Sequence, residues 1–331
     1  MLTGVPQGSI LGPLLFLIYI NDLPSAAANL KCVSFADDSN FITQGSDLAI
    51  LTKSLTKELE HISDFFKANQ LKLNAQKTKM VIFRKKRLPL NHQDMNVYLE
   101  GVKLSHDDSA EFLGITIDST LSWDKHCSNI ANKISRNNGM LNRVKHMLPP
   151  CSLRLLYHSF IQPHIQYGIP AWGGCSAQNK KRVVSIQKRA IRTITKSYIT
   201  AHTEPRMKKL GLLKFDDLYK IECMSLVHDC VHGNAPANIE SGLKLAISSE
   251  HNLRNQVENP LDLRIPNLKT RAGTSSFSAN GPRLWNSIST EFRSIKRKVS
   301  FKKAIKNSIL SSYEQKALCS NPRCRDHSNH S

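Results

Sequence analysis

Residues 31–43 read Lys31-Cys32-Val33-Ser34-Phe35-Ala36-Asp37-Asp38-Ser39-Asn40-Phe41-Ile42-Thr43. Apolar and aromatic residues flank a polar centre, which predicts strands over 31–36 and 40–43 with Asp37, Asp38 and Ser39 in the turn between them. Neighbouring residues of a regular strand point to opposite faces, whereas at a hairpin tip two carboxylates can converge on one ligand. Hard divalent cations such as Mg²⁺ accept oxygen ligands of this kind. From the residues alone, this segment is either a polar hairpin turn or part of a metal site.

Helices and short strands alternate around this hairpin as far as residue 118. The apolar run over 10–20 predicts a buried helix, and apolar residues spaced three or four apart predict an amphipathic helix that is capped by Ser46 and ends near Ala68. Further strands are expected over 79–83, 97–104 and 111–117. We therefore predict an α+β fold for residues 1–118, with a small antiparallel sheet backed by helices.

Beyond Trp123 the pattern becomes helical. Helices are predicted over about 125–147, 152–166 and 178–199, and Pro163 is expected to bend or end the second of them. After residue 200 the signals are weaker, with loops over 233–282 and a basic helix near 291–313. The predicted organisation is a first domain over 1–118, a basic and mainly α-helical domain over 119–200, and a C-terminal region over 201–331 of uncertain fold.

Positive charge is unevenly distributed along the chain. The 331 residues include 46 Lys and Arg against 26 Asp and Glu, which gives a net charge of +20. Residues 125–203 contain 13 basic side chains and no acidic one, whereas residues 1–124 have a net charge of −2. Clustered cations release counterions when they bind nucleic acid, so the middle segment is expected to bind a polyanion. The expected contacts to a phosphate backbone are Lys181, Arg182, Lys188, Arg189 and Arg192.

Cysteines and apolar runs restrict the class of protein. The eight cysteines are scattered without a compact framework, so most are expected to be reduced thiols. The longest apolar run, residues 14–20, is shorter than a membrane-spanning helix and has no basic segment before it. We therefore expect an intracellular protein, in the nucleus or the cytoplasm, with no membrane partner. Zinc-ligand residue types occur near the end of the chain, at Cys319, Cys324, His327 and His330, but their spacing is unlike that of common zinc sites, and zinc binding there stays open.

Several motifs follow one another in an order that is typical of one enzyme family. They read Gly4-Val5-Pro6-Gln7-Gly8-Ser9, Asn21-Asp22-Leu23-Pro24, Phe35-Ala36-Asp37-Asp38, Phe112-Leu113-Gly114, Tyr167-Gly168, Ala171-Trp172-Gly173 and Gln187-Lys188-Arg189-Ala190. In this order they resemble the reverse transcriptases of non-LTR retrotransposons, especially jockey-like elements. The resemblance implies a partial right-hand polymerase palm over 1–118, followed by a helical thumb over 119–200.

The resemblance also assigns roles to individual residues. Asp37 and Asp38 match the catalytic carboxylates that hold two Mg²⁺ ions in the family, and the ions stabilise the attacking and leaving oxygens. The residues that match the template- and nucleotide-binding elements are Gly4, Pro6, Gln7, Gly8, Ser9, Phe35 and Lys77, with a solvated side chain as the alternative for Lys77. Phe112, Leu113 and Gly114 match the hairpin that grips the primer terminus, with a buried strand as the structural alternative. The implied partners are an RNA template, a DNA primer or RNA–DNA duplex, and deoxynucleoside triphosphates.

The resemblance leaves part of the active site unaccounted for. Relatives carry fingers and a first palm aspartate before the motif that stands here at residues 4–9. The sequence therefore predicts a fragment of an RNA-directed DNA polymerase, a nucleotidyltransferase whose two-metal site is incomplete and which has little or no activity by itself. The alternative is a non-catalytic protein, derived from a retroelement, that binds RNA or an RNA–DNA duplex. Template preference, target site and oligomeric state are not indicated by the sequence.

Overall fold

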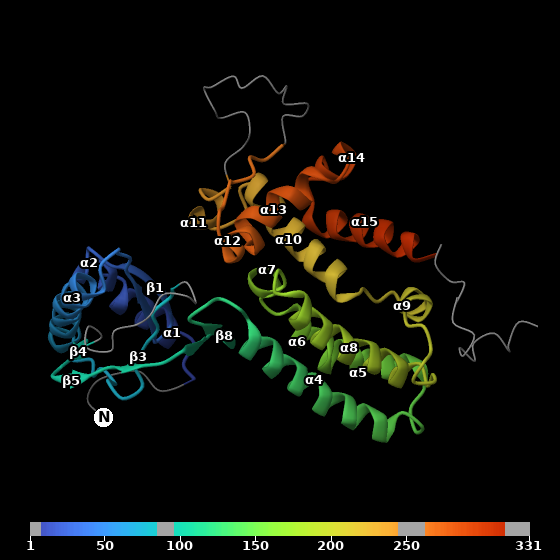
Figure 1. Cartoon of the computed structure of the whole chain (residues 1–331), viewed down its shortest axis with the longest axis horizontal. Helices are drawn as coiled ribbons and strands as arrows, with labels where there is room; N and C mark the ends of the chain where they lie inside the picture. Colours follow the sequence, from blue (N-terminus) through green and yellow to red (C-terminus); the bar gives the residue numbers. More distant parts are fainter. Residues whose placement is uncertain (1–7, 85–95, 244–261, 315–331) are drawn as a thin grey trace, which may run out of the picture. The chain divides into compact units, whose positions relative to one another are not determined.

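The computed structural model describes the chain except for residues 1–7, 85–95, 244–261 and 315–331, and it divides into two compact units (Figure 1). The first unit comprises residues 1–110 and 118–120, and the second comprises residues 111–117 and 121–331. The first unit combines helices with short strands and the second is mainly helical, which confirms the predicted combination of helices with small sheets.

The described residues of the first unit form short strands and three helices. Its elements are α1 (Gly12–Ile20), α2 (Leu23–Ala26), β1 (Lys31–Phe35), β2 (Asp38–Ile42), α3 (Leu48–Ala68), β3 (Lys79–Met80), β4 (Tyr98–Leu99), β5 (Val102–Lys103) and β6 (Ser105–His106). The last two strands, β7 (Ser109–Phe112) and β8 (Ile115–Asp118), run through the boundary between the units. In the described residues the strands form separate pairs, β1–β2, β3–β6, β4–β5 and β7–β8, and not one continuous sheet.

Two strands predicted as continuous are hairpins. The expected strand over 97–104 turns back at Glu100 and Gly101, and the expected strand over 111–117 turns back at Leu113 and Gly114. All four turn residues have positive φ, between 47° and 77°, which reverses the chain within two residues. β3 and β6 pair in parallel, so the prediction of purely antiparallel pairing is wrong there.

The long helix α3 contributes to the hydrophobic core of the first unit. Its start differs by one residue from the prediction, because the carboxylate of Asp47, and not Ser46, accepts hydrogen bonds from the backbone N–H groups of Ala49 and Ile50. One face of α3 contributes Leu59 and Ile62 to a core. The rest of that core is Ile20, Leu23, Ala27, Leu30, Met80, Val97, Leu99 and Leu104.

Helix α1 is where the sequence predicts it, but it is not buried. Leu14, Leu17 and Ile18 are 53–66% exposed, whereas Ile20 is buried in the core and Phe16 packs against it. The prediction of a buried helix is wrong because the core of this unit covers one side of α1 while the helix is apolar on all sides. A contiguous apolar surface of this kind is typical of a contact site.

The second unit is helical. Its helices are α4 (Asp124–Val144), α5 (Pro150–Phe160), α6 (Gln162–Gln166), α7 (Ile169–Trp172), α8 (Ala177–Ile194), α9 (Glu204–Leu210), α10 (Phe215–Val231), α11 (Ala237–Glu240), α12 (Arg271–Ser275), α13 (Phe277–Asn286), α14 (Thr290–Arg293), α15 (Lys298–Ser311) and the short 3₁₀ helix η3 (Ser312–Glu314). The helix predicted over 152–166 is divided at Ile161, one residue before α6 begins with Pro163 in its first turn. The basic helix predicted near 291–313 is likewise divided, into α14 and α15.

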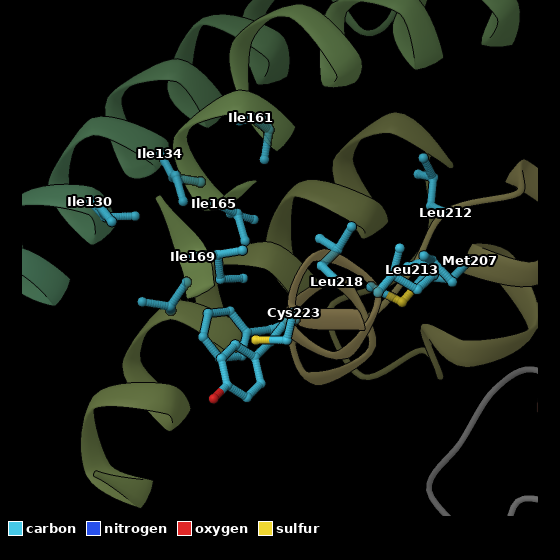
Figure 2. Close-up of a cluster of buried hydrophobic side chains, with 14 of the residues drawn as sticks. Ile130, Ile134, Ile161, Ile165, Ile169, Met207, Leu212, Leu213, Leu218 and Cys223 are labelled. Atoms are coloured by element: carbon cyan, nitrogen blue, oxygen red, sulfur yellow. The ribbon is translucent and has the colours of Figure 1, made fainter. Parts of the chain in front are cut away.

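One core joins the predicted thumb segment to the C-terminal region. Figure 2 shows isoleucines of α4, α6 and α7 converging with the leucines that surround the start of α10. The described part of α10 is buried along most of its length and packs against α7, α8, α13 and α15. Trp172 and Trp285, one from each predicted segment, are both fully buried in this core. Residues 121–243 and 262–314 are therefore one packed body.

A buried amide links the helices of this core. The side-chain Nε2 of Gln187 on α8 donates to Tyr157 Oη on α5 (3.1 Å) and to the carbonyl of Leu213 (3.0 Å). Its Oε1 accepts from the backbone N–H of Phe215, at the start of α10 (3.1 Å). Gln187, Tyr157 and Phe215 are at most 1% exposed, so these groups have no access to water. The amide therefore satisfies polar groups of α5 and α10 that would otherwise be buried without partners.

None of the helices in the described residues is long and apolar enough to cross a membrane. Cys32, Cys127, Cys151, Cys175, Cys223 and Cys230 are free thiols, as predicted, although the Sγ atoms of Cys127 and Cys175 are 3.8 Å apart.

We predict that Gln187→Ala lowers the free energy of unfolding of the helical unit by about 3 kcal/mol, because three buried groups lose their partner. The three tryptophans of the sequence all lie in this unit, so urea unfolding followed by tryptophan fluorescence measures its stability. Gln178→Ala, at an exposed position of the same helix, is the matched control and should change stability by less than about 0.5 kcal/mol. Equal effects of the two substitutions would contradict the proposed role of the amide.

Candidate active site and nucleic-acid interface

The hairpin β1–β2 places Asp37 and Asp38 at its tip. The strands pair in antiparallel register from Lys31 opposite Ile42 to Phe35 opposite Asp38, so the turn consists of Ala36 and Asp37. Ala36 has φ +51° and reverses the chain. The prediction that Asp38 and Ser39 lie between the strands is therefore wrong, because a two-residue turn suffices and Asp38 begins β2.

The two faces of this hairpin differ. Cys32 and Phe41 pack against the core of the first unit, and on the same face Ser34 Oγ lies 3.2 Å from Ser39 Oγ. The opposite face carries Asp38 directly across from Phe35, which is 61% exposed. Asp37 and Asp38 are both exposed as well. The hairpin is therefore fixed from one side and presents two carboxylates beside an aromatic ring on the other.

The donor set at this tip fits one part of a magnesium site. Mg²⁺ in proteins commonly binds one or two carboxylates and takes its remaining oxygens from water and substrate phosphates. Asp37 and Asp38 are exposed and supply such carboxylates. Among the described residues there is no group of three or more His, Cys, Asp or Glu side chains arranged to hold a metal ion.

Of the nucleotide- and template-binding residues predicted from the first motif, the structure describes Gly8 and Ser9. Gly4, Pro6 and Gln7 lie outside the described residues. Gly8 has φ +91° and no heavy atom within 4 Å of where a Cβ would lie, so its backbone faces open space. Ser9 Oγ accepts from the backbone N–H of Gly12, the first residue of α1 (3.0 Å).

Lys77 follows a turn of the first unit and is exposed. The side chain and carbonyl of Asn74 both accept from the backbone N–H of Lys77, each at 3.1 Å. The turn therefore fixes the backbone of Lys77 and leaves its ammonium group in solvent, an arrangement that suits phosphate binding and a solvated lysine equally.

The turn at Leu113 and Gly114 belongs to the helical unit. Two side chains that were given no role from the sequence, Tyr167 and His126, attach the turn and the strand after it to the helices. Tyr167 Oη donates to the carbonyl of Leu113 (2.7 Å). The backbone N–H of Thr116 donates to Nδ1 of His126 on α4 (3.2 Å). The motif Tyr167-Gly168 was the available sequence signal for the first of these contacts, whereas His126 stands in no motif of the chain.

The five cationic residues predicted on α8 divide into two groups. Lys181, Lys188 and Arg189 are exposed. Arg182 instead donates to Ser128 Oγ (2.6 Å) and to the Asp124 carbonyl at the start of α4, and Arg192 donates through Nε to the carbonyl of Ala201 (2.9 Å). The guanidinium groups of the two arginines thus form hydrogen bonds within the fold. The other three side chains are exposed and are therefore more available for phosphate contact.

Helix α4 adds cations that the sequence analysis passed over. Lys133, Arg136 and Arg143 are exposed and fall on one side of the helix at spacings of three and seven residues. α4 and α8 pack closely along each other, and Asn179 Nδ2 donates to the Ser122 carbonyl beside the start of α4 (3.1 Å). The adjoining helices therefore both expose cations.

The buried imidazole of His126 can accept the Thr116 hydrogen bond only while it is neutral. Burial, and to a smaller extent the charge of Lys133, lower the pKa of His126 from 6.5 to about 4. The unfolded chain therefore binds a proton that the folded chain excludes between pH 6.5 and about 4. Stability from this group is fully present above pH 6.5 and decreases as the pH falls through that window.

We predict that the free energy of unfolding of the helical unit falls by about 3 kcal/mol between pH 7 and pH 4 through His126 alone. His126→Gln retains a polar side chain that does not titrate, so its unfolding free energy should depend less steeply on pH in this range. His146→Gln, at an exposed position just after the end of α4, is the control and should keep the wild-type dependence of unfolding free energy on pH. Denaturant unfolding at a series of pH values measures the difference, and identical slopes for all three proteins would contradict the prediction.

Residues 1–117 match the protein family described as reverse transcriptase (RNA-dependent DNA polymerase). The matched segment includes the Asp37–Asp38 hairpin and the turn at Leu113 and Gly114, and it ends before α4. No solved structure matches the chain.

Similar curated proteins come from transposable elements of Drosophila melanogaster. The chain is 31% identical over 206 residues to the probable RNA-directed DNA polymerase from transposon BS, covering 59% of this chain and 22% of that protein. It is 27% identical over 227 residues to the probable polymerase from transposon X-element, covering 66% and 24%, and 24% identical over 203 residues to the polymerase from mobile element jockey, covering 58% and 22%. The chain thus spans about a fifth of the length of these relatives. The predicted resemblance to reverse transcriptases of jockey-like and other non-LTR elements is confirmed for residues 1–117 and by the names of these relatives.

Proposed function

We propose that this chain is the part of an RNA-directed DNA polymerase of a non-LTR retroelement that carries two palm carboxylates and the helical thumb. The observation that carries the proposal is the hairpin tip with Asp37 and Asp38, which lies within the segment that matches reverse transcriptases. Its partners are an RNA template, a DNA primer or RNA–DNA duplex, and deoxynucleoside triphosphates. An intracellular location, in the nucleus or cytoplasm, belongs to the same proposal.

Asp37 and Asp38 would hold Mg²⁺ at the hairpin tip. Bound there, the ions supply charge stabilisation for the attacking and leaving oxygens of nucleotidyl transfer. Ala36 sets the direction of the tip, and the packing of Cys32 and Phe41 against the core keeps the base of the hairpin in place. Phe35 lies across from Asp38 with most of its ring exposed, which suits contact with a nucleotide.

The first unit would contribute further contacts to the triphosphate and template. The open surroundings of Gly8 allow a strand or nucleotide to approach its backbone closely, and Ser9 keeps the start of α1 in place. Lys77 would contribute an exposed ammonium group. Both assignments follow from the resemblance, and the exposure of these groups is compatible with them.

The helical unit would hold the duplex by its phosphates. Exposed cations of α4 and α8 supply the contacts, namely Lys133, Arg136, Arg143, Lys181, Lys188 and Arg189. Two acidic side chains of α10 do not neutralise these cations, because Asp216 pairs with Lys180 and Glu222 pairs with Lys302. Phosphate contacts position a duplex without reading its sequence, so binding should depend on backbone form and on salt.

A second candidate function is non-catalytic binding of RNA or an RNA–DNA duplex. The observation that favours it is that the exposed cations belong to a unit with its own large core, separate from the unit with Asp37 and Asp38. The two candidates differ in what they require of the carboxylates, since binding alone needs neither aspartate.

We predict that the double substitution Lys188→Ala, Arg189→Ala reduces the slope of log affinity against log salt concentration for an RNA–DNA duplex by about 2, because each lost phosphate contact removes about 0.9. Affinity at 0.15 M salt should fall about tenfold. The matched control is Lys53→Ala, Lys57→Ala, which removes the same charge from exposed positions of α3. Equal losses in both proteins would mean that net charge, and not the α8 surface, determines binding.

We predict that Fe²⁺, used in place of Mg²⁺ with ascorbate and peroxide, cleaves the chain near residue 37 when primer-template and deoxynucleotide are present. Asp37→Asn, Asp38→Asn should abolish this cleavage, because the ion loses both carboxylates. Asp107→Asn, Asp108→Asn is the matched control, since this second adjacent pair lies in the same unit and Asp107 is already paired with Lys79 (2.7 Å). Cleavage that persists without Asp37 and Asp38 would favour the non-catalytic candidate.

Primer extension by the chain alone should be slight, because Asp37 and Asp38 are exposed at a turn and two-metal transfer needs ligands held in place. Incorporation of labelled deoxynucleotide on an RNA template measures it. Rapid extension that Asp37→Asn abolishes would overturn the expectation of low activity while supporting the metal site.

A further inference from the structure

The turn at Leu113 and Gly114 is a strained element of the helical unit. Both residues have positive φ, +47° and +77°, as in the mirror-image turns of two-residue hairpins. Asn or Gly is usual at the first of these positions, whereas the Cβ of Leu113 crowds the backbone at positive φ, so this residue is held there at a cost. A strained turn keeps its geometry only where surrounding contacts hold it.

Tyr167 supplies such contacts. Its hydroxyl donates to the carbonyl of Leu113 at 2.7 Å, which fixes the first peptide of the turn. Its ring also lies against the second turn residue, because Cε1 is 3.6 Å from the position of a Cβ on Gly114. One side chain therefore contacts both residues of the turn.

Tyr167 is itself held by the core of the helical unit. Its backbone N–H donates to the carbonyl of Pro163 (2.9 Å), and its carbonyl accepts from the indole Nε1 of the fully buried Trp172 (2.9 Å). At the next residue, Gly168 has φ +59°, and a Cβ there would lie 2.3 Å from Cδ1 of Ile115. The chain at 167–168 is thus shaped to receive the hairpin closely.

The outer part of Tyr167 remains open. The residue is 57% exposed, although its hydroxyl and one ring edge are engaged by the turn. Anything that binds at Leu113 and Gly114 therefore meets a turn whose position is set by the helices and not by the strands alone.

We infer that Tyr167 is a positioning residue that orients the Leu113–Gly114 turn for contact with the recessed 3′ end of a primer strand. This inference rests on the proposed function, in which the hairpin of Phe112, Leu113 and Gly114 contacts the primer terminus. Tyr167 touches the turn and acts through it, so its loss changes recognition of a strand end more than affinity for a continuous duplex.

The test compares two ligands on the same protein, an RNA–DNA duplex with a recessed DNA 3′ end and a continuous duplex of equal length and charge. Wild-type protein should bind the recessed end about fivefold more tightly, the ratio that one added hydrogen-bonded contact supplies. Tyr167→Phe removes the hydroxyl and keeps the ring, and should reduce the ratio to about 1 with unchanged affinity for the continuous duplex. Tyr198→Phe, at another exposed tyrosine of this unit, is the control and should keep the wild-type ratio.

Two other outcomes separate the possible failures. A wild-type ratio near 1 would refute the primer-terminus role in the proposed function, and this inference with it. A wild-type preference that Tyr167→Phe retains would refute the inference alone. Hydrogen exchange at the amides of Gly114 and Ile115 checks the mechanism, because the variant should exchange about fivefold faster there with the Trp172 region unchanged. Unaltered exchange in the variant would also overturn the positioning role.

Discussion

The helical unit depends on the buried side-chain amide of Gln187. Its nitrogen serves Tyr157 on α5 and the Leu213 carbonyl, and its oxygen serves the Phe215 N–H at the start of α10. A helix start leaves backbone N–H groups unpaired, and in a core without water such a group has to find a protein acceptor. Because α8 provides that acceptor, α10 can begin inside the core, and α13 and α15 then pack around it. The C-terminal helices are thus part of the same body as α4 and α8.

This arrangement separates the helical unit into an apolar interior and a cationic exterior. α8 directs Val183, Ala190 and Ile191 inward and Lys188 and Arg189 outward. Acidic residues of α10 pair with lysines of α8 and α15, which keeps their charge local. A helical surface with that pattern suits the backbone of a duplex, and a core that spans the C-terminal region gives the surface a rigid support.

Much of this could be predicted from the sequence, and the errors have physical causes. Periodic segments predicted α3 and α4 to within three residues and the start of α8 to within one, because amphipathic spacing records which face is buried. The end of α8 at Ile194 was predicted five residues too late. Turns were placed less well. Leu113 and Ala36 adopt positive φ although neither is a residue that favours it. The reversal at Leu113 was therefore missed, and the hairpin turn that the polar residues predicted at 37–39 was placed too late. The exposure of α1 could not be read from its composition, since an apolar helix looks the same whether or not a partner covers it. Arg182 and Arg192 looked like phosphate contacts because charge patterns do not reveal intramolecular carbonyl acceptors.

The two hairpins to which we assign functional roles are held in opposite ways. At Leu113 and Gly114 the turn is held from outside by Tyr167, and Thr116 is tied to a histidine that burial keeps neutral. At Ala36 and Asp37 the strands are paired and one face is packed, while the two carboxylates at the tip are exposed. A preformed turn can recognise a strand end without further ordering, whereas exposed carboxylates that repel each other gain order when cations and phosphates bind between them. In the proposed function, recognition at the Leu113–Gly114 turn would therefore depend on the helical core, and chemistry at the Asp37–Asp38 hairpin would depend on the groups that the substrate supplies.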